Sequence, residues 1–205
     1  MVRTASASPP LSSAPAAAAT RLAGLRAWME RQDLEAAYVT RPVSIAYLTG
    51  VRADPHERLM ALAVRHDGAT LIVPALEQEN ATRSSEQVDI VAWRDGEDPY
   101  ELVRTAVGGS RRLGVEKEHL TVEAAEALSA RAAVGELVDI APEIRKLRLI
   151  KGADELEKIA RACAITDEVT EEVMQRMRAG QSELAIALEI GTAIAAHDAS
   201  AAFEM

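Results

Sequence analysis

Residues 59–74 read LMALAVRHDGATLIVP and contain two apolar runs, Leu59–Arg65 and Ala69–Pro74, separated by Asp67-Gly68. An Asp-Gly pair tolerates the positive φ angles of a type I′ turn, which joins two antiparallel strands with a loop of two residues. The stretch therefore predicts a β-hairpin, and no other segment of the chain carries an equally strong hairpin signal.

Strands and helices alternate on both sides of this hairpin. Apolar residues at helical spacing predict a helix that begins near Thr20, which is a suitable N-cap. Further helices are expected over 99–107 and 121–134, and short apolar runs predict strands at 36–39, 88–93, 112–115 and 137–140. Because strands alternate with helices, the sequence predicts a layered α/β domain over residues 21–140.

The first 20 residues consist mainly of Ala, Ser and Pro. Such a segment has too little bulky apolar surface to offset the entropy lost on ordering, so residues 1–20 are expected to form a disordered tail. A transit peptide is the alternative, because the segment contains Arg3 and the first acidic residue is Glu30. Both interpretations remain open on the sequence alone.

The pattern changes after residue 140. Basic and apolar residues interleave over 141–153, which is expected to be a linker. A long helix is predicted over 154–178, with Asp154 as its cap and Glu157 completing a capping box. Gly180 is expected to end this region and Ser182 to cap a second helix. Residues 154–205 therefore form a separate C-terminal segment.

Composition excludes several classes of protein. The 205 residues include 23 basic and 32 acidic side chains, and the net charge of −9 argues against a nucleic-acid binder, which needs a basic face. The single cysteine, Cys163, excludes an internal disulfide and a cysteine-rich zinc site, and fits a reducing compartment. No apolar stretch approaches the ~20 residues that span a bilayer. A cytoplasmic protein without a membrane partner is expected.

The sequence also lacks the common catalytic and nucleotide-binding motifs. It contains no Gly-x-Gly-x-x-Gly, no phosphate-binding Gly-Lys-Ser/Thr loop, no His-Glu-x-x-His and no Gly-x-Ser-x-Gly. The four histidines are scattered without ligand spacing, and three of them, His66, His119 and His197, are expected to be structural. Cys163 is expected in the core, and Met174 and Met177 in the core or a subunit contact. No catalytic residue and no metal ligand is therefore predicted.

One loop is chemically unusual. The segment Ala53-Asp54-Pro55-His56-Glu57-Arg58 places four ionisable groups in a proline-containing loop between two apolar runs. A loop held by rigid elements suits ligand contact, although an ordinary charged surface loop has the same composition. The residues alone leave both interpretations open.

Three motifs together resemble the creatinase/prolidase family. Tyr47-Leu48-Thr49-Gly50 looks like the family's N-terminal signature, and Ile144–Lys151 followed by Glu155 is similar to the entry into its catalytic domain. Gly180-Gln181-Ser182-Glu183 matches the turn between the first two helices of that domain. The family comprises Xaa-Pro aminopeptidases, prolidases, creatinase and related amidohydrolases. The resemblance covers residues 21–205.

The resemblance implies a ribonuclease-H-like layered α/β domain followed by the start of a pita-bread catalytic domain. The family's catalytic domain binds two divalent metal ions, such as Mn, Zn or Co, through two Asp, one His and two Glu. In the family these ligands and a preceding catalytic histidine lie beyond the strand that Ala202–Met205 resembles. The expectation is therefore a truncated chain with the first two pita-bread helices, no metal of its own and no activity alone.

The resemblance also implies a homodimer in which N-terminal loops approach the partner's active site. His56 and Arg58, in the loop after Tyr-Leu-Thr-Gly, are the candidate substrate-facing residues, and the planar fork of Arg58 suits a substrate carboxylate. A peptide or small amide substrate is expected only in a complete parent protein. The alternative is a stand-alone, non-catalytic α/β module that dimerises or binds a small ligand.

Overall fold

The computed structural model describes residues 14–85 and 87–200, which form two compact units that divide between Ile150 and Lys151. The first, here named the N-terminal unit, contains α1 (Ala14–Arg31), β1 (Ala36–Val39), α2 (Pro42–Thr49), β2 (Ala61–Arg65), β3 (Ala69–Pro74), η1 (Ala75–Glu77), α3 (Gln78–Ser84), β4 (Asp89–Trp93), α4 (Tyr100–Val107), β5 (Arg112–Val115), α5 (Val122–Arg131), β6 (Glu136–Asp139) and α6 (Ala141–Leu149). The second, here named the helical pair, contains α7 (Ala153–Arg176) and α8 (Glu183–Ala196).

The strands form one mixed sheet in the order β4-β3-β2-β1-β5-β6. Strand β2 pairs antiparallel with β1 and β3, whereas β3–β4, β1–β5 and β5–β6 pair in parallel. Five strands therefore run in one direction and only β2 runs against them. Consequently the carboxyl ends of β1, β3, β4, β5 and β6 share one edge of the sheet with the beginning of β2.

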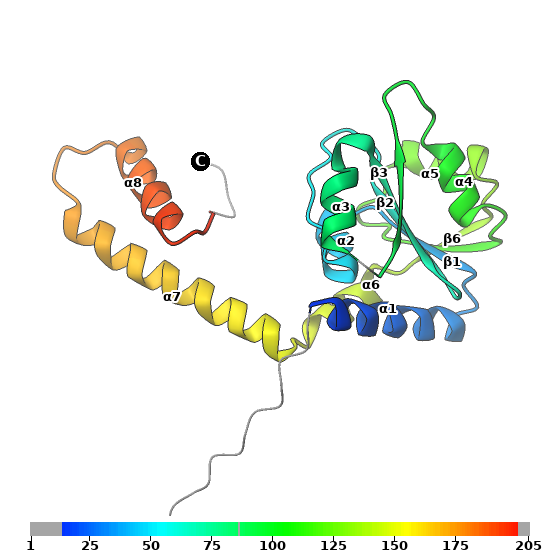
Figure 1. Cartoon of the computed structure of the whole chain (residues 1–205), viewed down its shortest axis with the longest axis horizontal. Coiled ribbons are helices and arrows are strands. Elements are labelled where there is room, and N and C mark those ends of the chain that lie inside the picture. The colour runs from blue at the N-terminus through cyan, green and yellow to red at the C-terminus, as the bar shows by residue number, and fades with distance from the viewer. Residues whose placement is uncertain (1–13, 86, 201–205) are drawn as a thin grey trace, which may run out of the picture. The chain divides into compact units, whose positions relative to one another are not determined.

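Helices cover both faces of the sheet. Figure 1 shows α2 and α3 on one side and α4 and α5 on the other. Buried residues of α1, α2, α3 and α6 share one apolar cluster with alternate strand residues, such as Leu62 and Leu71. The remaining strand residues, such as Ile72 and Leu113, form a second cluster with α4 and α5. This arrangement confirms the predicted layered α/β domain and explains why the strands are continuously apolar.

The predicted hairpin is confirmed, but its predicted turn is wrong. The Arg65 N–H donates to the Gly68 carbonyl at 2.9 Å, so His66 and Asp67 form the two-residue loop. None of residues 66–68 has a positive φ, which excludes type I′. The Arg65 carbonyl accepts a hydrogen bond of 2.9 Å from Arg26 Nε, which ties the hairpin to α1.

The remaining predicted strands agree with the structure to within one residue, and the predicted helices at 99–107 and 121–134 correspond to α4 and α5. Thr121 caps α5, and its side chain accepts from the Ala124 N–H at 3.1 Å. The start of α1 differs from the prediction, because the helix begins at Ala14 and its Ala18 is already buried. Residues 14–20 are therefore helical and not part of a tail; residues 1–13 lie outside the described residues.

Residues 141–149, expected to belong to a linker, form α6. Its Ile144 is buried in the core of the N-terminal unit. The hydroxyl of Tyr47, in α2, donates to the Leu147 carbonyl at 2.8 Å. The Arg21 guanidinium lies 4.3 Å above the Tyr47 ring and donates to the Tyr47 carbonyl at 2.9 Å. Thus α1, α2 and α6 are joined, and the segment has a fixed conformation because it completes the core.

The helical pair follows most of the predicted pattern. Gly180 has a φ of +90°, and the Ser182 hydroxyl accepts from the Ala185 N–H at 3.2 Å, as predicted. The predicted capping box is wrong by two residues, because the Glu155 carboxylate accepts from the Gly152 N–H at 2.9 Å. The two helices contact each other through buried Val169, Val173 and Ala193. Residues 201–205, including the expected strand from Ala202, lie outside the described residues.

Candidate functional site

The charged loop between α2 and β2 lies at the edge where the carboxyl ends of the parallel strands meet. Helix α2 ends at Gly50, whose φ of +84° is the left-handed conformation that glycine adopts readily. Val51 is buried and begins the loop, and the loop returns to the sheet at Ala61. Because β2 is antiparallel to its neighbours, its entry loop is beside the segments that follow β3 and β4.

Side chains from two other elements hold the ends of this loop. Asn80, in α3, donates from Nδ2 to the Arg52 carbonyl at 2.9 Å. Trp93, the last residue of β4, donates from Nε1 to the Leu59 carbonyl at 3.0 Å. Both acceptors are main-chain groups, so these two contacts hold the ends of the loop whichever side chains it carries.

Arg58 is fixed by a carboxylate that follows β4. Its Nε donates to Asp95 Oδ1 and its Nη2 to Asp95 Oδ2, each at 3.2 Å. The Arg58 hydrogen bonds lower the pKa of Asp95, and the same pair raises the pKa of Arg58. Glu57 is the second neighbouring acid, 3.8 Å from Arg58 Nη1. The two-point geometry is the one expected of an arginine that holds a carboxylate.

The tip of the loop is exposed and conformationally unusual. The His56 side chain is 75% exposed and its Nδ1 lies 3.9 Å from Asp54 Oδ1. The φ of His56 is +53°, a backbone conformation that residues other than glycine adopt rarely. Such conformations often occur at functional sites. The structure therefore places His56 and Arg58 on one loop, with Arg58 held by this chain and the His56 ring directed to solvent.

A second group of residues at the same edge was not predicted from the sequence. Arg41, which follows β1, and Arg145, in α6, both form ion pairs with Glu118, which follows β5. Ser44, in α2, donates to the neighbouring Glu116 at 2.7 Å. Strands β1 and β5 are adjacent and parallel, and the helices that follow them cover opposite faces, which defines a topological switch point. Sheet order, which local patterns do not contain, brings these residues together.

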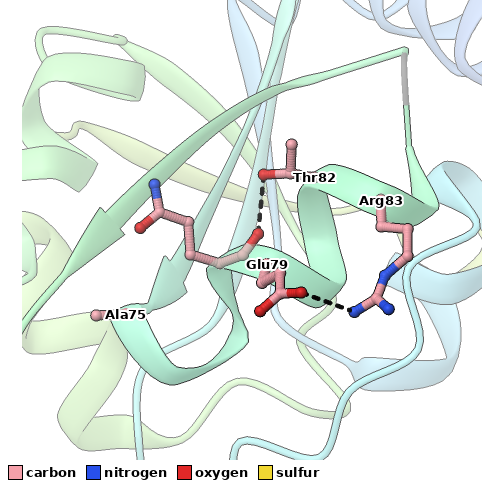
Figure 2. Close-up of a pocket in the computed structure, with 5 residues that line it drawn as sticks. Ala75, Glu79, Thr82 and Arg83 are labelled. Atoms are coloured by element: carbon pink, nitrogen blue, oxygen red, sulfur yellow. Dashed lines mark hydrogen bonds and ion pairs between the residues drawn. The ribbon is translucent and has the colours of Figure 1, made fainter.

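A depression of about 580 Å³ lies on the surface of α3. It is lined by Ala75, Gln78, Glu79, Thr82 and Arg83 (Figure 2). Arg83 pairs with Glu79 at 3.6 Å, and the Thr82 hydroxyl donates to the Gln78 carbonyl at 2.8 Å. These polar groups are bound within their own helix, so the depression presents no converging set of polar groups for a ligand.

Three residues expected in a core are instead on the surface. Cys163 is exposed on α7, and Met174 and Met177 are also exposed, so the predicted core positions are wrong. The reason is that α7 buries only the face that contacts α8, around Val169 and Val173. A subunit contact for the two methionines stays a prediction.

The other histidines have local contacts. His66 Nε2 lies 2.9 Å from the Leu34 carbonyl, which ties the hairpin to the segment before β1. His197 ends α8 as predicted and its Nδ1 lies 3.8 Å from Glu168. His119 is exposed before α5.

Within residues 14–85 and 87–200, no three His, Cys, Asp or Glu side chains converge as metal ligands. Over the same residues, no helix has the length and apolar composition needed to cross a membrane.

Comparison with known proteins assigns the N-terminal unit. Residues 21–150 match the family described as Creatinase/Prolidase N-terminal domain. The chain belongs to this family. The match ends at the last residue of the N-terminal unit, which agrees with the inclusion of α6 in its core.

Curated relatives of this creatinase/prolidase-family chain are longer proteins. An uncharacterized peptidase of Staphylococcus aureus (strain bovine RF122 / ET3-1) is 35% identical over 156 residues, which are 76% of this chain and 44% of the relative. Another, from S. aureus strain USA300, is 34% identical over 156 residues with the same coverage of 76% and 44%. The chain therefore spans about half the length of the curated relatives that it matches.

Solved structures support the same assignment. A proline dipeptidase structure from Streptococcus pneumoniae TIGR4 is 34% identical with a TM-score of 0.60, and the match covers 63% of this chain and 98% of that chain. The prolidase from Pyrococcus horikoshii OT3 has a TM-score of 0.77 at 23% identity, over 87% of this chain and 49% of that chain, and shows similarity of fold.

Proposed function

We propose that this chain supplies the N-terminal domain of a metal-dependent Xaa-Pro peptidase or related amidohydrolase, and that its Val51–Met60 loop covers the active site of a partner subunit. The observation that carries the proposal is the loop itself, which is anchored at Arg52 and Leu59 while its charged tip is exposed. A rigid base with an exposed polar tip is suited to reach into a site on another molecule.

The chemistry of the loop fits a peptide with a free carboxylate. Arg58 offers a planar fork of N–H donors, and Asp95 engages only its Nε and Nη2. A substrate carboxylate would replace Glu57 beside Nη1 or exchange with Asp95. The exposed ring of His56 would act as a second polar contact, because an imidazole can donate or accept a hydrogen bond.

Metal binding and catalysis would belong to residues outside the described part of this chain. Relatives of about twice the matched length include peptidases, and the carboxylate-rich centre of the family would lie in their remaining sequence. The chain alone is therefore proposed to hold no catalytic metal and to hydrolyse no Xaa-Pro dipeptide. The single free Cys163 fits the proposed cytoplasmic location.

Self-association is part of the proposal, because a loop that covers a partner's site requires a partner. The helical pair exposes Leu156 and Ile159 on α7 and Leu184 and Leu188 on α8, four large apolar side chains that its two helices leave uncovered. Apolar helix faces of this kind commonly pack against another helix. A homodimer would bury them.

The test measures hydrolysis and metal retention by the full chain. The protein is incubated with Mn²⁺, Zn²⁺ or Co²⁺, dialysed, analysed for bound metal and assayed with leucyl-proline. The proposal expects no stoichiometric metal and no turnover. Retained metal together with dipeptide hydrolysis would overturn the proposal that metal binding and catalysis lie outside this chain.

A further inference from the structure

Among the residues that the structure describes, Glu116 has a buried side-chain oxygen without a hydrogen-bond partner. It directly follows β5 and is 3% exposed. Its Oε1 accepts a hydrogen bond of 2.7 Å from the Ser44 hydroxyl. Its Oε2 is buried and has no hydrogen-bond partner within the described chain. Buried carboxylates normally have several partners, so this arrangement requires an explanation.

Few charged groups surround Glu116, and some of them are already engaged in other ion pairs. Arg41 and His119 favour the negative charge, whereas Glu118 opposes it, and Arg41 is itself paired with Glu118. On β6, Asp139 accepts from the Lys117 N–H at 3.2 Å and adds another acid near this edge. Burial raises the pKa of Glu116, and the Ser44 hydrogen bond and the nearby Arg41 and His119 side chains offset this only in part.

We propose that the Glu116 carboxyl fastens the first turn of α2 to the end of β5 most firmly in its neutral form, so that this contact is sensitive to pH. In the neutral form the group keeps its Ser44 hydrogen bond and leaves one O–H unsatisfied. When the proton is lost to solvent, a full charge is left with one hydrogen bond in a buried place, which costs more than the neutral acid. Raising the pH therefore destabilises the contact between β5 and α2.

The contact is connected to the candidate site by a short path. Helix α2 has eight residues, carries Ser44 in its first turn and is followed by Gly50, after which the Val51–Met60 loop starts. If the first turn of α2 became more mobile, the loop that carries His56 and Arg58 would therefore become more mobile as well. Asn80 and Trp93 hold the loop separately, so α2 is expected to loosen before the loop does.

The sign of the pH dependence follows from linkage. The pKa of Glu116 is raised by folding, so its stabilising contribution is complete below the pKa of the unfolded chain and is lost as the pH rises through the folded value. Within that window one proton is involved, and the folding equilibrium constant falls by up to about tenfold per pH unit.

The experiment compares the full chain with Glu116→Gln and Glu126→Gln between pH 4.5 and 9. Glutamine keeps the acceptor for Ser44 and carries no charge, so the proposal expects Glu116→Gln to remove the loss of stability with rising pH. Glu126→Gln changes an exposed carboxylate on α5 and is expected to retain the loss of stability with rising pH. Amide exchange of residues 42–49 in the unchanged chain should accelerate over the same pH window.

A direct titration keeps the proposal falsifiable if Glu116→Gln does not fold. The ¹³C resonance of the Glu116 carboxyl in the unchanged protein should titrate above the ordinary glutamate pKa of 4.5. Titration at or below that value would overturn the proposal, as would equal pH dependence of stability in the unchanged chain and in Glu116→Gln.

Discussion

Arg58 and Asp95 are joined by two hydrogen bonds of 3.2 Å, although the strands next to them, β2 and β4, are separated in the sheet by β3. The pair therefore crosses the end of a strand and connects two loops on the same edge. Together with Trp93, whose indole donates to Leu59, it determines where the Val51–Met60 loop lies. The position of Arg58 therefore depends on the order of the strands in the sheet as well as on the loop.

Substitution of Asp95 by Asn is expected to increase amide exchange at residues 54–58 and to change the melting temperature little, because the pair is exposed and screened. Since Arg58 lowers the pKa of Asp95, the unchanged protein should keep its loop protection at neutral pH and lose it as the pH falls through the lowered pKa. Asp89→Asn, at the exposed first residue of β4, is the control. Equal exchange in both variants would show that the pair does not fix the loop.

Replacement of Tyr47 by Phe removes the hydroxyl that donates to Leu147 and keeps the ring beneath Arg21. We expect a loss of about 1 kcal/mol in the free energy of unfolding, the usual contribution of one hydrogen bond. Chemical denaturation measures it. Tyr100→Phe is the matched control, because the Tyr100 ring also contacts an arginine and its hydroxyl has no hydrogen-bond acceptor among the described residues. A loss of equal size in both variants would refute the assignment.

Much of the sheet could be predicted from the sequence because its strands are short, apolar and bounded by turns. The helix at 42–49 was missed because its residues, PVSIAYLT, are apolar on all sides and show no helical periodicity. The helix at 141–149 was missed because alternating basic and apolar residues resemble a linker, whereas burial of Ile144 against α1 orders it. Tertiary contacts decided both cases.

The candidate site was predictable only where its residues are consecutive. The loop with His56 and Arg58 stands out as a charged segment, so composition was sufficient to find it. Asp95 and Glu116 are distant in sequence from the groups that they contact, and no local pattern links them. Their roles depend on which strands are neighbours, and strand order follows from packing of the whole domain.

The core beneath α2 is expected to be sensitive to truncation. Leu48 is fully buried in the cluster shared with α1 and α6, so Leu48→Ala should lower the free energy of unfolding by about 2–5 kcal/mol. Leu76 is 83% exposed, and Leu76→Ala should change the free energy of unfolding by no more than about 0.5 kcal/mol. Urea denaturation of both variants measures the difference. Similar values would mean that Leu48 does not occupy the core position described here.

Self-association should depend on the exposed face of α7. The variant Leu156→Glu/Ile159→Glu changes two exposed side chains and is expected to shift sedimentation toward monomer without loss of helix content. Val173→Glu is the contrasting variant, because Val173 is buried between α7 and α8 and a charge there should disrupt the pair itself. A monomeric unchanged chain at tens of micromolar, an order of magnitude for modest interfaces, would contradict the homodimer.

The most direct test of the proposed role is a hybrid in which this chain replaces the matching part of the longer S. aureus relative. The measurement is the KM for leucyl-proline with Arg58 intact and in Arg58→Ala. If the loop contacts substrate in a site completed by the remaining sequence, KM should rise by roughly tenfold or more, since a charged hydrogen bond is lost, while kcat changes less. An active hybrid whose KM is unchanged by Arg58→Ala would contradict the account.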